Sequence, residues 1–523
     1  MENSSKPNIL LIMADQLTAA AVACYGNPVV KTPNIDRFAE QGTLFENAYC
    51  NFPICGPSRA SMLTGMLPSR VGAWDNACDF PASVPTMPYY LRELGYRTIL
   101  SGKMHFCGPD QLHGYEERLV TDIYPADFYW APDWTQTGHL TTAAGTNMRG
   151  VVESGVAQRT LQIDYDEEVH YRSTRMLYDL ARSPEDRPFF MTISYTHPHH
   201  PFTAQQEFWD LYDRDEIDMP EVPWIPVEER DAHAQRLYYL ARMDEFDIGD
   251  ERVRTARHAY YAMISFIDRK IGELLDTLEQ TGLDQNTVVV FVSDHGEMMG
   301  ERGMWYKMNF YENAVRVPMI LRVPGQEGGQ RVAAPASLVD LLPTFVDFGR
   351  QDAPFDYVEE MDGANLVDIA NGIGTDRFIC AEYTSEGTIE PCFMLVKGGY
   401  KFIWAEQDGA MLYDLNTDPN ELVDLSTSPE HTHVMAEMET ELHRRWDVKD
   451  VYNRCLLSQQ RRAKVQKAMM APGKKPDWNH EPHEPAAERY VRSGIPANLI
   501  KSRSRFPKFE SLEVDTPRGD GGF

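Results

Sequence analysis

The segment from Cys55 to Gly65 holds the residues of this sequence best suited to covalent chemistry. It reads Cys-x-Pro-Ser-Arg, with Cys55, Pro57 and Arg59 closely spaced, and it closes on Leu-Thr-Gly. Proline is favoured in the first turn of a helix, so Pro57 predicts that Cys55 lies where free backbone N–H groups attract an anion. Arg59 can hold that anion through charge-assisted hydrogen bonds. The alternative is a buried cysteine acting as a small apolar side chain, but the residues after Cys55 favour the chemical interpretation.

Two polar pairs, each directly after a β-rich apolar run, predict a cation site. Asp15 and Gln16 follow the first run. Asp294 and His295 follow the second. Two carboxylates with an amide oxygen suit a hard divalent cation such as Ca²⁺, Mg²⁺ or Mn²⁺, which would polarise a bound oxyanion. An aspartate after a strand is often only a turn or a helix cap; the recurrence of the pattern beside Cys55 favours the metal.

Lysines and histidines in three further segments supply positive charge and proton-transfer groups. Lys103, His197 and Lys307 are the candidates to neutralise the oxygens of an anionic substrate and to protonate a leaving alcohol. The histidine run could instead form a transition-metal site. We interpret His199 and His200 as structural neighbours of His197 rather than as ligands.

The elements that must position these side chains alternate between strand and helix patterns. The runs 8–14 and 287–293 are nearly continuous apolar segments, as in strands buried on both faces of a mainly parallel sheet. Residues 255–282 carry apolar positions at helical spacing and end at a glycine. This alternation predicts an α/β sandwich. Ligands gather at the carboxyl ends of strands in such sheets, which is where both polar pairs fall.

From about residue 376 the pattern predicts a small antiparallel subdomain. A hairpin is expected around the Gly-Gly turn at 398–399, with a further strand at 410–413 and a helix at 435–446. From 447 the sequence is rich in Pro, Arg and Lys and ends in Gly-Asp-Gly-Gly, which we interpret as an extended tail. The expected division is a main domain at 1–375, a small α+β subdomain at 376–446 and a C-terminal tail at 447–523.

Composition excludes several classes of function. The chain has 523 residues, 42% of them hydrophobic, so it can bury a large core. A formal charge of −29 disfavours binding to nucleic acid, because such binding needs basic patches. Neither a signal peptide nor an apolar stretch of membrane-spanning length is apparent. The eight cysteines are scattered without metal-type spacing, which predicts free thiols in a cytoplasmic protein.

The motif at Cys55 resembles the activation signature of type I sulfatases, in which this cysteine is oxidised to Cα-formylglycine. Two further segments extend the resemblance to the choline-sulfatases. One begins Gly-Lys-Met-His-Phe-Cys-Gly at residue 102 and runs to 127; the other reads Gly-Glu-Arg-Gly-Met-Trp-Tyr-Lys-Met-Asn at 300–309. Ser-Gln-Gln-Arg-Arg at 458–462 continues it into the C-terminal region. The resemblance implies an alkaline-phosphatase-like fold for nearly the whole chain.

The same resemblance implies a role for each site residue. Formylglycine from Cys55 is the nucleophile, stabilised by Arg59 and assisted by His105. Lys103 and Lys307 clamp the sulfate, and His197 is the acid for the leaving group. One divalent cation, Ca²⁺ in the first place, is held by a set of five residues: Asp15, Gln16, Cys55, Asp294 and His295. A formylglycine-generating enzyme is the implied maturation partner, and the tail implies a homodimer or homotetramer.

Choline-O-sulfate is the leading substrate by this resemblance. Trp130 and Glu386 match positions used for the quaternary ammonium, which aromatic faces and carboxylates recognise. Thr146 replaces a histidine of the family's pocket, and residues 493–499 lack the expected acidic side chains. Two alternatives are a broader hydrolase of sulfate, phosphate or phosphonate esters and a binding protein whose Cys55 is never matured.

Overall fold

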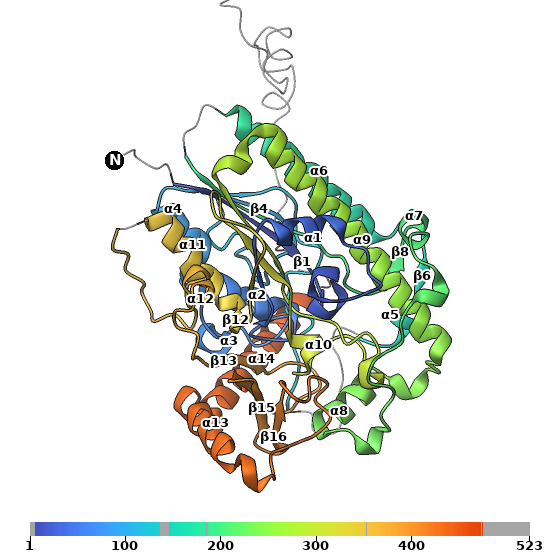
Figure 1. Cartoon of the computed structure of the whole chain (residues 1–523). Coiled ribbons are helices and arrows are strands. Elements are labelled where there is room, and N and C mark those ends of the chain that lie inside the picture. Colours follow the sequence, from blue (N-terminus) through green and yellow to red (C-terminus); the bar gives the residue numbers. More distant parts are fainter. Residues whose placement is uncertain are drawn as a thin grey trace, which may run out of the picture.

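The fold is described by a computed structural model covering residues 6–135, 146–183, 187–351, 353–471, 473 and 478. Its centre is an eight-stranded, mainly parallel sheet (Figure 1). In spatial order the strands are β11 (Gln330–Val332), β2 (Thr43–Phe45), β10 (Met319–Arg322), β9 (Thr287–Ser293), β1 (Asn8–Ala14), β7 (Phe189–Ser194), β4 (Arg97–Gly102) and β5 (Glu117–Arg118). Strands β9, β1, β7 and β4 are parallel neighbours, and β10 runs antiparallel to β9 and β2.

The apolar run of β1 forms a strand because both of its faces are covered. Ile9 and Leu11 pack into the core on one face, while Leu10 and Ile12 pack into the core on the other. Helices α1 (Pro33–Glu40), α6 (Leu161–Arg182) and α9 (Asp250–Thr281) lie on the second face, and α2 (Cys55–Thr64), α4 (Met87–Glu93) and α11 (Leu341–Arg350) lie on the first (Figure 1). The predicted α/β sandwich is therefore confirmed.

The C-terminal part forms the predicted antiparallel sheet. Its strands in order are β13 (Ile379–Tyr383), β14 (Cys392–Lys397), β15 (Tyr400–Ala405) and β16 (Gly409–Asp414), and α13 (Thr432–Arg445) packs on it. Gly398 and Gly399 both have positive φ in the β14–β15 turn, where a side chain would be strained. Outside these sheets, the described residues form two further strand pairs, β3 (Ala48–Tyr49) with β12 (Ala336–Ser337) and β6 (Gly155–Val156) with β8 (Thr203–Ala204).

The interpretation of the C-terminal tail as extended is wrong for its first third. Residues Val448–Met470 form helix α14, which begins where the Asp447 side chain accepts a hydrogen bond from the Asp450 backbone N–H. No proline or glycine occurs within this stretch, and the Pro- and Gly-rich composition starts after it. Averaging the composition over the whole tail concealed a helix with a proper N-cap.

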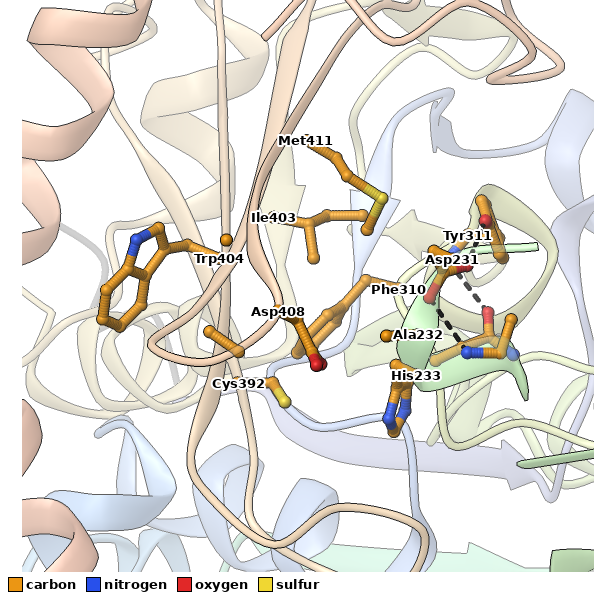
Figure 2. Close-up of a pocket in the computed structure, with 14 residues that line it drawn as sticks. Asp231, Ala232, His233, Phe310, Tyr311, Cys392, Ile403, Trp404, Asp408 and Met411 are labelled. Carbon is orange, nitrogen blue, oxygen red and sulfur yellow. Dashed lines mark hydrogen bonds between the residues drawn. The ribbon is translucent and has the colours of Figure 1, made fainter. Parts of the chain in front are cut away.

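The remaining α-helices of the described chain are α3 (Pro68–Val71), α5 (Arg149–Val152), α7 (Gln206–Trp209), α8 (Ala232–Leu240), α10 (Glu312–Val315) and α12 (Leu366–Ala370). A small cavity of about 50 Å³ lies between α8 and the C-terminal sheet, with His233 and Cys392 in its lining (Figure 2). It is too small for an organic substrate, for which 300 Å³ or more is usual (about 300–1,000 Å³). None of the helices in the described ranges has the length and apolar character needed to cross a membrane.

Candidate active site

Four parallel strands deliver the candidate residues to one edge of the sheet. Asp15 follows β1, Asp294 follows β9, Lys103 follows β4, and the histidine run follows β7. Helix α2 points its first residue, Cys55, at the same edge. Sequence-distant side chains meet here because parallel strands end together, as the two polar pairs predicted.

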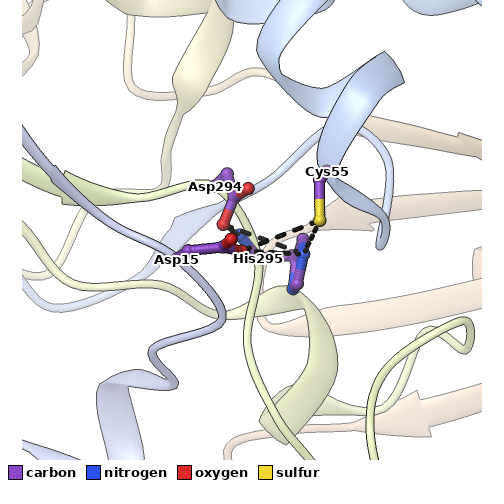
Figure 3. Close-up of side chains that lie close together, drawn as sticks. All are labelled: Asp15, Cys55, Asp294 and His295. Carbon is purple, nitrogen blue, oxygen red and sulfur yellow. Dashed lines mark hydrogen bonds and ion pairs between the residues drawn. The ribbon is translucent and has the colours of Figure 1, made fainter. Parts of the chain in front are cut away.

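Four buried side chains form a cluster that suits a cation (Figure 3). One donor atom each from Asp15, Cys55, Asp294 and His295 lies within 4.8 Å of the others. The His295 Nε2 lies 3.1 Å from the Cys55 sulfur and 3.7 Å from an Asp15 oxygen. Its Nδ1 lies 3.0 Å from the Gly296 carbonyl oxygen, which can only accept, so the hydrogen on Nδ1 is fixed and loss of a proton from the charged ring would free the Nε2 lone pair for a ligand.

The pKa shifts of Asp15 and Asp294 also indicate a cation site. Burial, and then the charge of Asp294, raises the pKa of Asp15 to about 7. Burial alone would also raise the pKa of Asp294, but Arg59 and His295 outweigh it and lower that pKa to about 2. Two buried carboxylates this close repel each other when both are ionised, and a divalent cation would remove that repulsion. The donor set therefore fits a metal ion.

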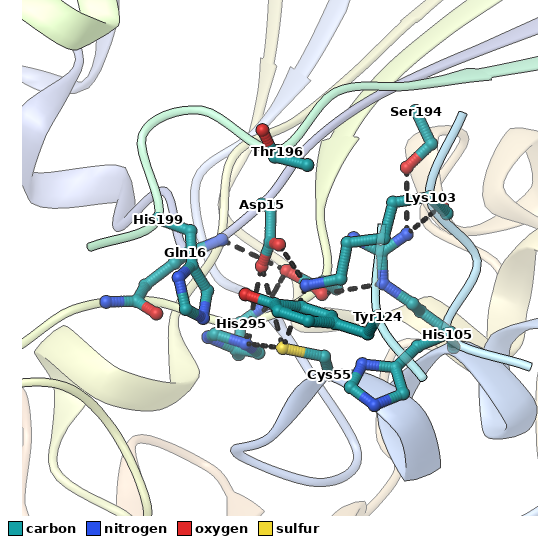
Figure 4. Close-up of polar contacts among 12 residues, drawn as sticks. Asp15, Gln16, Cys55, Lys103, His105, Tyr124, Ser194, Thr196, His199 and His295 are labelled. Atoms are coloured by element: carbon teal, nitrogen blue, oxygen red, sulfur yellow. Dashed lines mark hydrogen bonds and ion pairs between the residues drawn. The ribbon is translucent and has the colours of Figure 1, made fainter. Parts of the chain in front are cut away.

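Lys103 and His295 both contact the Cys55 sulfur (Figure 4). Lys103 Nζ donates to the sulfur at 3.3 Å and also contacts the Asp15 carboxylate. Although burial opposes it, the charges of Lys103, Lys307 and His295 lower the pKa of the Cys55 thiol well below its usual value. The ring of Tyr124 lies 4.5 Å from Lys103 Nζ. This environment favours an anionic group at position 55 and an anionic ligand beside it.

The Arg59 side chain is fully buried and forms hydrogen bonds to Asp294, Lys103 and Ser194. Its Nε donates to Asp294 at 2.8 Å, and its Nη1 donates to the Lys103 carbonyl at 2.6 Å and to Ser194 at 2.8 Å. A buried charge of this kind must be paired to be tolerated. The structure thus places Arg59 against a proposed metal ligand, while the cavity above Cys55 is lined by other residues.

Gln16 lies beside the cluster, and its side chain has three hydrogen-bond partners, one of which is His200 Nδ1 at 3.1 Å. The Gln16 Nε2 donates to the Glu297 carboxylate, and its Oε1 accepts from Lys307 Nζ. Glu297 is buried and also accepts backbone hydrogen bonds from Met299 and Tyr306. Sequence reasoning missed Glu297, although its position three residues after Asp294 was the available signal.

We expect Glu297→Gln to weaken divalent-cation binding about 10- to 100-fold. The oxygen of the new amide must still accept from Met299 and Tyr306, so its NH₂ group would face the NH₂ group of Gln16 and turn that amide round. Calorimetric titration of Ca²⁺ into chelator-stripped protein measures the affinity. Glu301→Gln, which changes a carboxylate hydrogen-bonded to the 221–222 backbone, is the control. Equal affinities for the Glu297 variant and the wild type would contradict the expectation.

The histidine run divides between two environments. His197 Nδ1 lies 2.6 Å from Asp166, and its ring packs 4.9 Å from Phe266; it is not among the residues that line the cavity. His199 does line the cavity, and its Nε2 lies 2.9 Å from Lys307 Nζ. The predicted acid, His197, therefore lies away from the cavity, and the two histidines that we interpreted as structural, His199 and His200, both line it.

The cavity above Cys55 has a volume of about 330 Å³, enough for a small organic ester. His105, Tyr124 and Trp130 lie along it, with Tyr124 and Trp130 5.5 Å apart in an edge-on arrangement. Glu386, which is 6% exposed, contributes a carboxylate. Thr146 is also in the lining. The stretch 493–499 lies outside the described residues.

Comparison with protein families matches residues 7–349 to the sulfatase family and residues 300–447 to the C-terminal part of N-sulphoglucosamine sulphohydrolase. Residues 453–506 match the choline sulfatase C-terminal region. Among curated proteins, the choline-sulfatase of Rhizobium meliloti is 40% identical over 97% of this chain and 100% of its own length. The arylsulfatase of Clostridium perfringens is 31% identical over 82% of this chain and 91% of its own.

Solved structures share the fold. The phosphonate monoester hydrolase of Agrobacterium radiobacter superposes with a TM-score of 0.68 at 21% identity, covering 84% of this chain and 95% of its own. A structure described as BT4656 in complex with D-glucosamine-2-N,6-O-disulfate has a TM-score of 0.67 at 23% identity, covering 86% and 98%. At such identities the likeness concerns the fold alone.

Proposed function

The chain belongs to the sulfatase family and is a sulfuric ester hydrolase, and we propose that it hydrolyses choline-O-sulfate to choline and sulfate. The observation that carries this proposal is the cavity above Cys55, because an aromatic wall, formed by Tyr124 and Trp130, and the buried Glu386 carboxylate line the same cavity as Cys55 and Lys307. A sulfate ester with a cationic alcohol has complementary charge at both ends. The 40% identity to a choline-sulfatase supports the same substrate.

The floor of the cavity supplies the reactive groups. We propose that Asp15, Gln16, residue 55, Asp294 and His295 hold one Ca²⁺, with Mg²⁺ and Mn²⁺ as alternatives. The bound cation supplies Lewis-acid polarisation of a sulfate oxygen. Formylglycine derived from Cys55 supplies, as its hydrate, an oxygen nucleophile.

Side chains around residue 55 would bind the sulfate and move protons. Lys103 and Lys307 place positive charge beside the sulfate oxygens, where charge develops during transfer. His105 Nε2 lies 2.9 Å from the Asn76 carbonyl oxygen and must donate to it, so Nδ1 is left to accept a proton. His199 Nδ1 donates to the His200 carbonyl, which directs Nε2 toward Lys307 and the cavity. We therefore assign His199 Nε2, instead of His197, as the group that passes a proton to the leaving alcohol; the proton reaches Nε2 along the hydrogen bond from Lys307 Nζ.

The substrate assignment is tested by replacing the groups proposed to contact the ammonium. We expect Glu386→Gln and Trp130→Ala each to raise KM for choline-O-sulfate about 10-fold, because a cation–π or carboxylate contact contributes about 1–2 kcal/mol. The rate on 4-nitrophenyl sulfate, which has no cationic group, should stay unchanged. Glu390→Gln, which changes a carboxylate bonded to the Gln407 backbone, is the control. Equal losses on both esters would refute the assignment.

A broader hydrolase of sulfate and phosphonate esters is the second candidate, supported by the fold shared with the phosphonate monoester hydrolase. Wild-type rates on choline-O-sulfate, 4-nitrophenyl sulfate and a phenyl phosphonate monoester separate the two. A clear preference for the phosphonate would favour the second candidate.

We also propose a maturation partner, a cellular location, a domain division and an oligomeric state for this protein. Maturation by a formylglycine-generating enzyme would act on Cys55, and a cytoplasmic location accords with eight cysteines that are all unpaired in the described chain. The division at 375 and 446, with the C-terminal region mediating a homodimer or homotetramer, accords with the choline sulfatase C-terminal match. Light scattering on the purified protein, with and without residues 472–523, would test the oligomer.

A further inference from the structure

Helix α14 buries a polar face against the active-site loops. Gln459, Arg462 and Gln466 are 2%, 3% and 9% exposed and lie at positions i, i+3 and i+7, which is one side of a helix. Buried polar side chains are costly unless they are hydrogen-bonded. Their partners therefore indicate what this face of the helix does, and the helix lies outside the region 7–349 that matches the sulfatase family.

The Arg462 side chain forms hydrogen bonds to the first and last residues of the turn at 75–77. Its Nη1 and Nη2 form a two-pronged pair with the Asp75 carboxylate, at 2.7 and 2.6 Å, and Nη1 also donates to the Ala77 carbonyl at 2.9 Å. Asp75 is 1% exposed. A bidentate arginine–carboxylate pair fixes orientation as well as distance, so the residue between them, Asn76, is held in one position.

Asn76 connects this turn to the reactive centre. Its backbone oxygen lies 2.9 Å from His105 Nε2, and its side-chain oxygen accepts from the Gly56 N–H at 2.8 Å. The carbonyl can only accept, so it fixes the His105 hydrogen on Nε2 and leaves Nδ1 as the base. His105 Nδ1 is buried without a hydrogen-bond partner among the described residues. Gly56 follows the nucleophile position directly, so Asn76 fixes two parts of the site at once.

Gln459 and Gln466 form hydrogen bonds to the backbone segment that carries Trp130. Gln459 Oε1 accepts from the Trp134 backbone N–H at 3.0 Å, and Gln466 Oε1 accepts from the Phe128 backbone N–H at 3.3 Å. Trp130 lies between these two positions and in the cavity lining. The same helix face thus fixes both ends of the segment that carries Trp130.

We propose that the polar face of α14 is a positioning element: through Asn76, Arg462 sets the tautomer of His105, while Gln459 and Gln466 set the place of Trp130. Arg462 affects the chemical step whatever the alcohol. The glutamines affect recognition of the cationic alcohol, and this part rests on the proposed function. The C-terminal region would thereby tune the rate and the specificity of the site separately.

The Arg462 part is tested with the double variant Asp75→Asn/Arg462→Met, which removes the pair without leaving a lone buried charge. We expect kcat to fall about 10²-fold on both choline-O-sulfate and 4-nitrophenyl sulfate, with KM little changed, because a small displacement of a catalytic group has this effect. In ¹⁵N NMR spectra of the folded protein, the His105 ring should show one Nε2–H tautomer in the wild type and a mixture in the variant. Arg461→Met, at the exposed neighbouring position, is the control.

The glutamine part is tested with Gln459→Leu and Gln466→Leu. We expect KM for choline-O-sulfate to rise 3- to 10-fold, because displacement of Trp130 weakens its cation–π contact, with kcat and the rate on 4-nitrophenyl sulfate unchanged. A folded Arg462 variant with wild-type kcat and one tautomer would overturn the first part. Equal effects on both esters would overturn the second. If the wild type does not accept choline-O-sulfate, the proposed substrate and the glutamine part both fail, while the NMR and 4-nitrophenyl sulfate measurements still decide the Arg462 part.

Discussion

Replacing Cys55 with alanine is expected to lower the rate of sulfate release about 10⁴-fold or more, since removal of a catalytic nucleophile has effects of that size. The Cys55 side chain lies at the first residue of α2, in contact with Lys103 and His295 and within the proposed cation cluster. Alanine removes both the nucleophile and a ligand. Initial rates on 4-nitrophenyl sulfate measure the loss without assuming the natural alcohol.

Two controls distinguish this loss from damage to the fold. Cys380→Ala changes another buried cysteine, in β13, and should retain wild-type activity. The mass of the wild-type peptide that contains residue 55 should show that one sulfur and two hydrogens have been replaced by one oxygen. Full activity of a preparation whose Cys55 is unmodified would contradict the formylglycine mechanism.

Replacing His199 with glutamine is expected to lower kcat on choline-O-sulfate about 10²- to 10⁴-fold, the usual contribution of a general acid. The alkoxide of an alkyl ester needs a proton as it leaves, whereas 4-nitrophenolate does not, so the loss on 4-nitrophenyl sulfate should be far smaller. Burial, and then the charge of Lys307, lowers the pKa of His199 to about 3. A sulfate bound beside Lys307 would offset that charge and favour proton transfer through His199.

The variant His197→Gln tests the sequence-based assignment of His197 as the acid for the leaving group. His197 is buried against Asp166 and Phe266, so its replacement should lower the melting temperature and affect both esters alike. A loss confined to the alkyl ester in the His197 variant, with His199→Gln unaffected, would restore His197 as the acid.

Much of the fold followed from local pattern. The apolar runs 8–14 and 287–293 became β1 and β9 at the predicted bounds, because a strand covered on both faces must be apolar throughout. The 255–282 pattern became α9 with its glycine cap, starting five residues earlier than predicted. Helix α14 was missed because the second half of its buried face, Gln459, Arg462 and Gln466, is polar, so the apolar periodicity that indicates most helices is weak there.

The sequence by itself determined the reaction class and indicated the proposed cation ligands, because each depends on residues adjacent in the chain or directly after a recognisable strand. Tertiary structure decided what depends on side-chain direction: that His199 enters the cavity while His197 turns to Asp166, and that Arg59 braces Asp294. It also decided the partner of Arg462, which is 387 residues away in the chain. Contacts over such separations leave no local pattern, because only packing of the whole chain brings their members together.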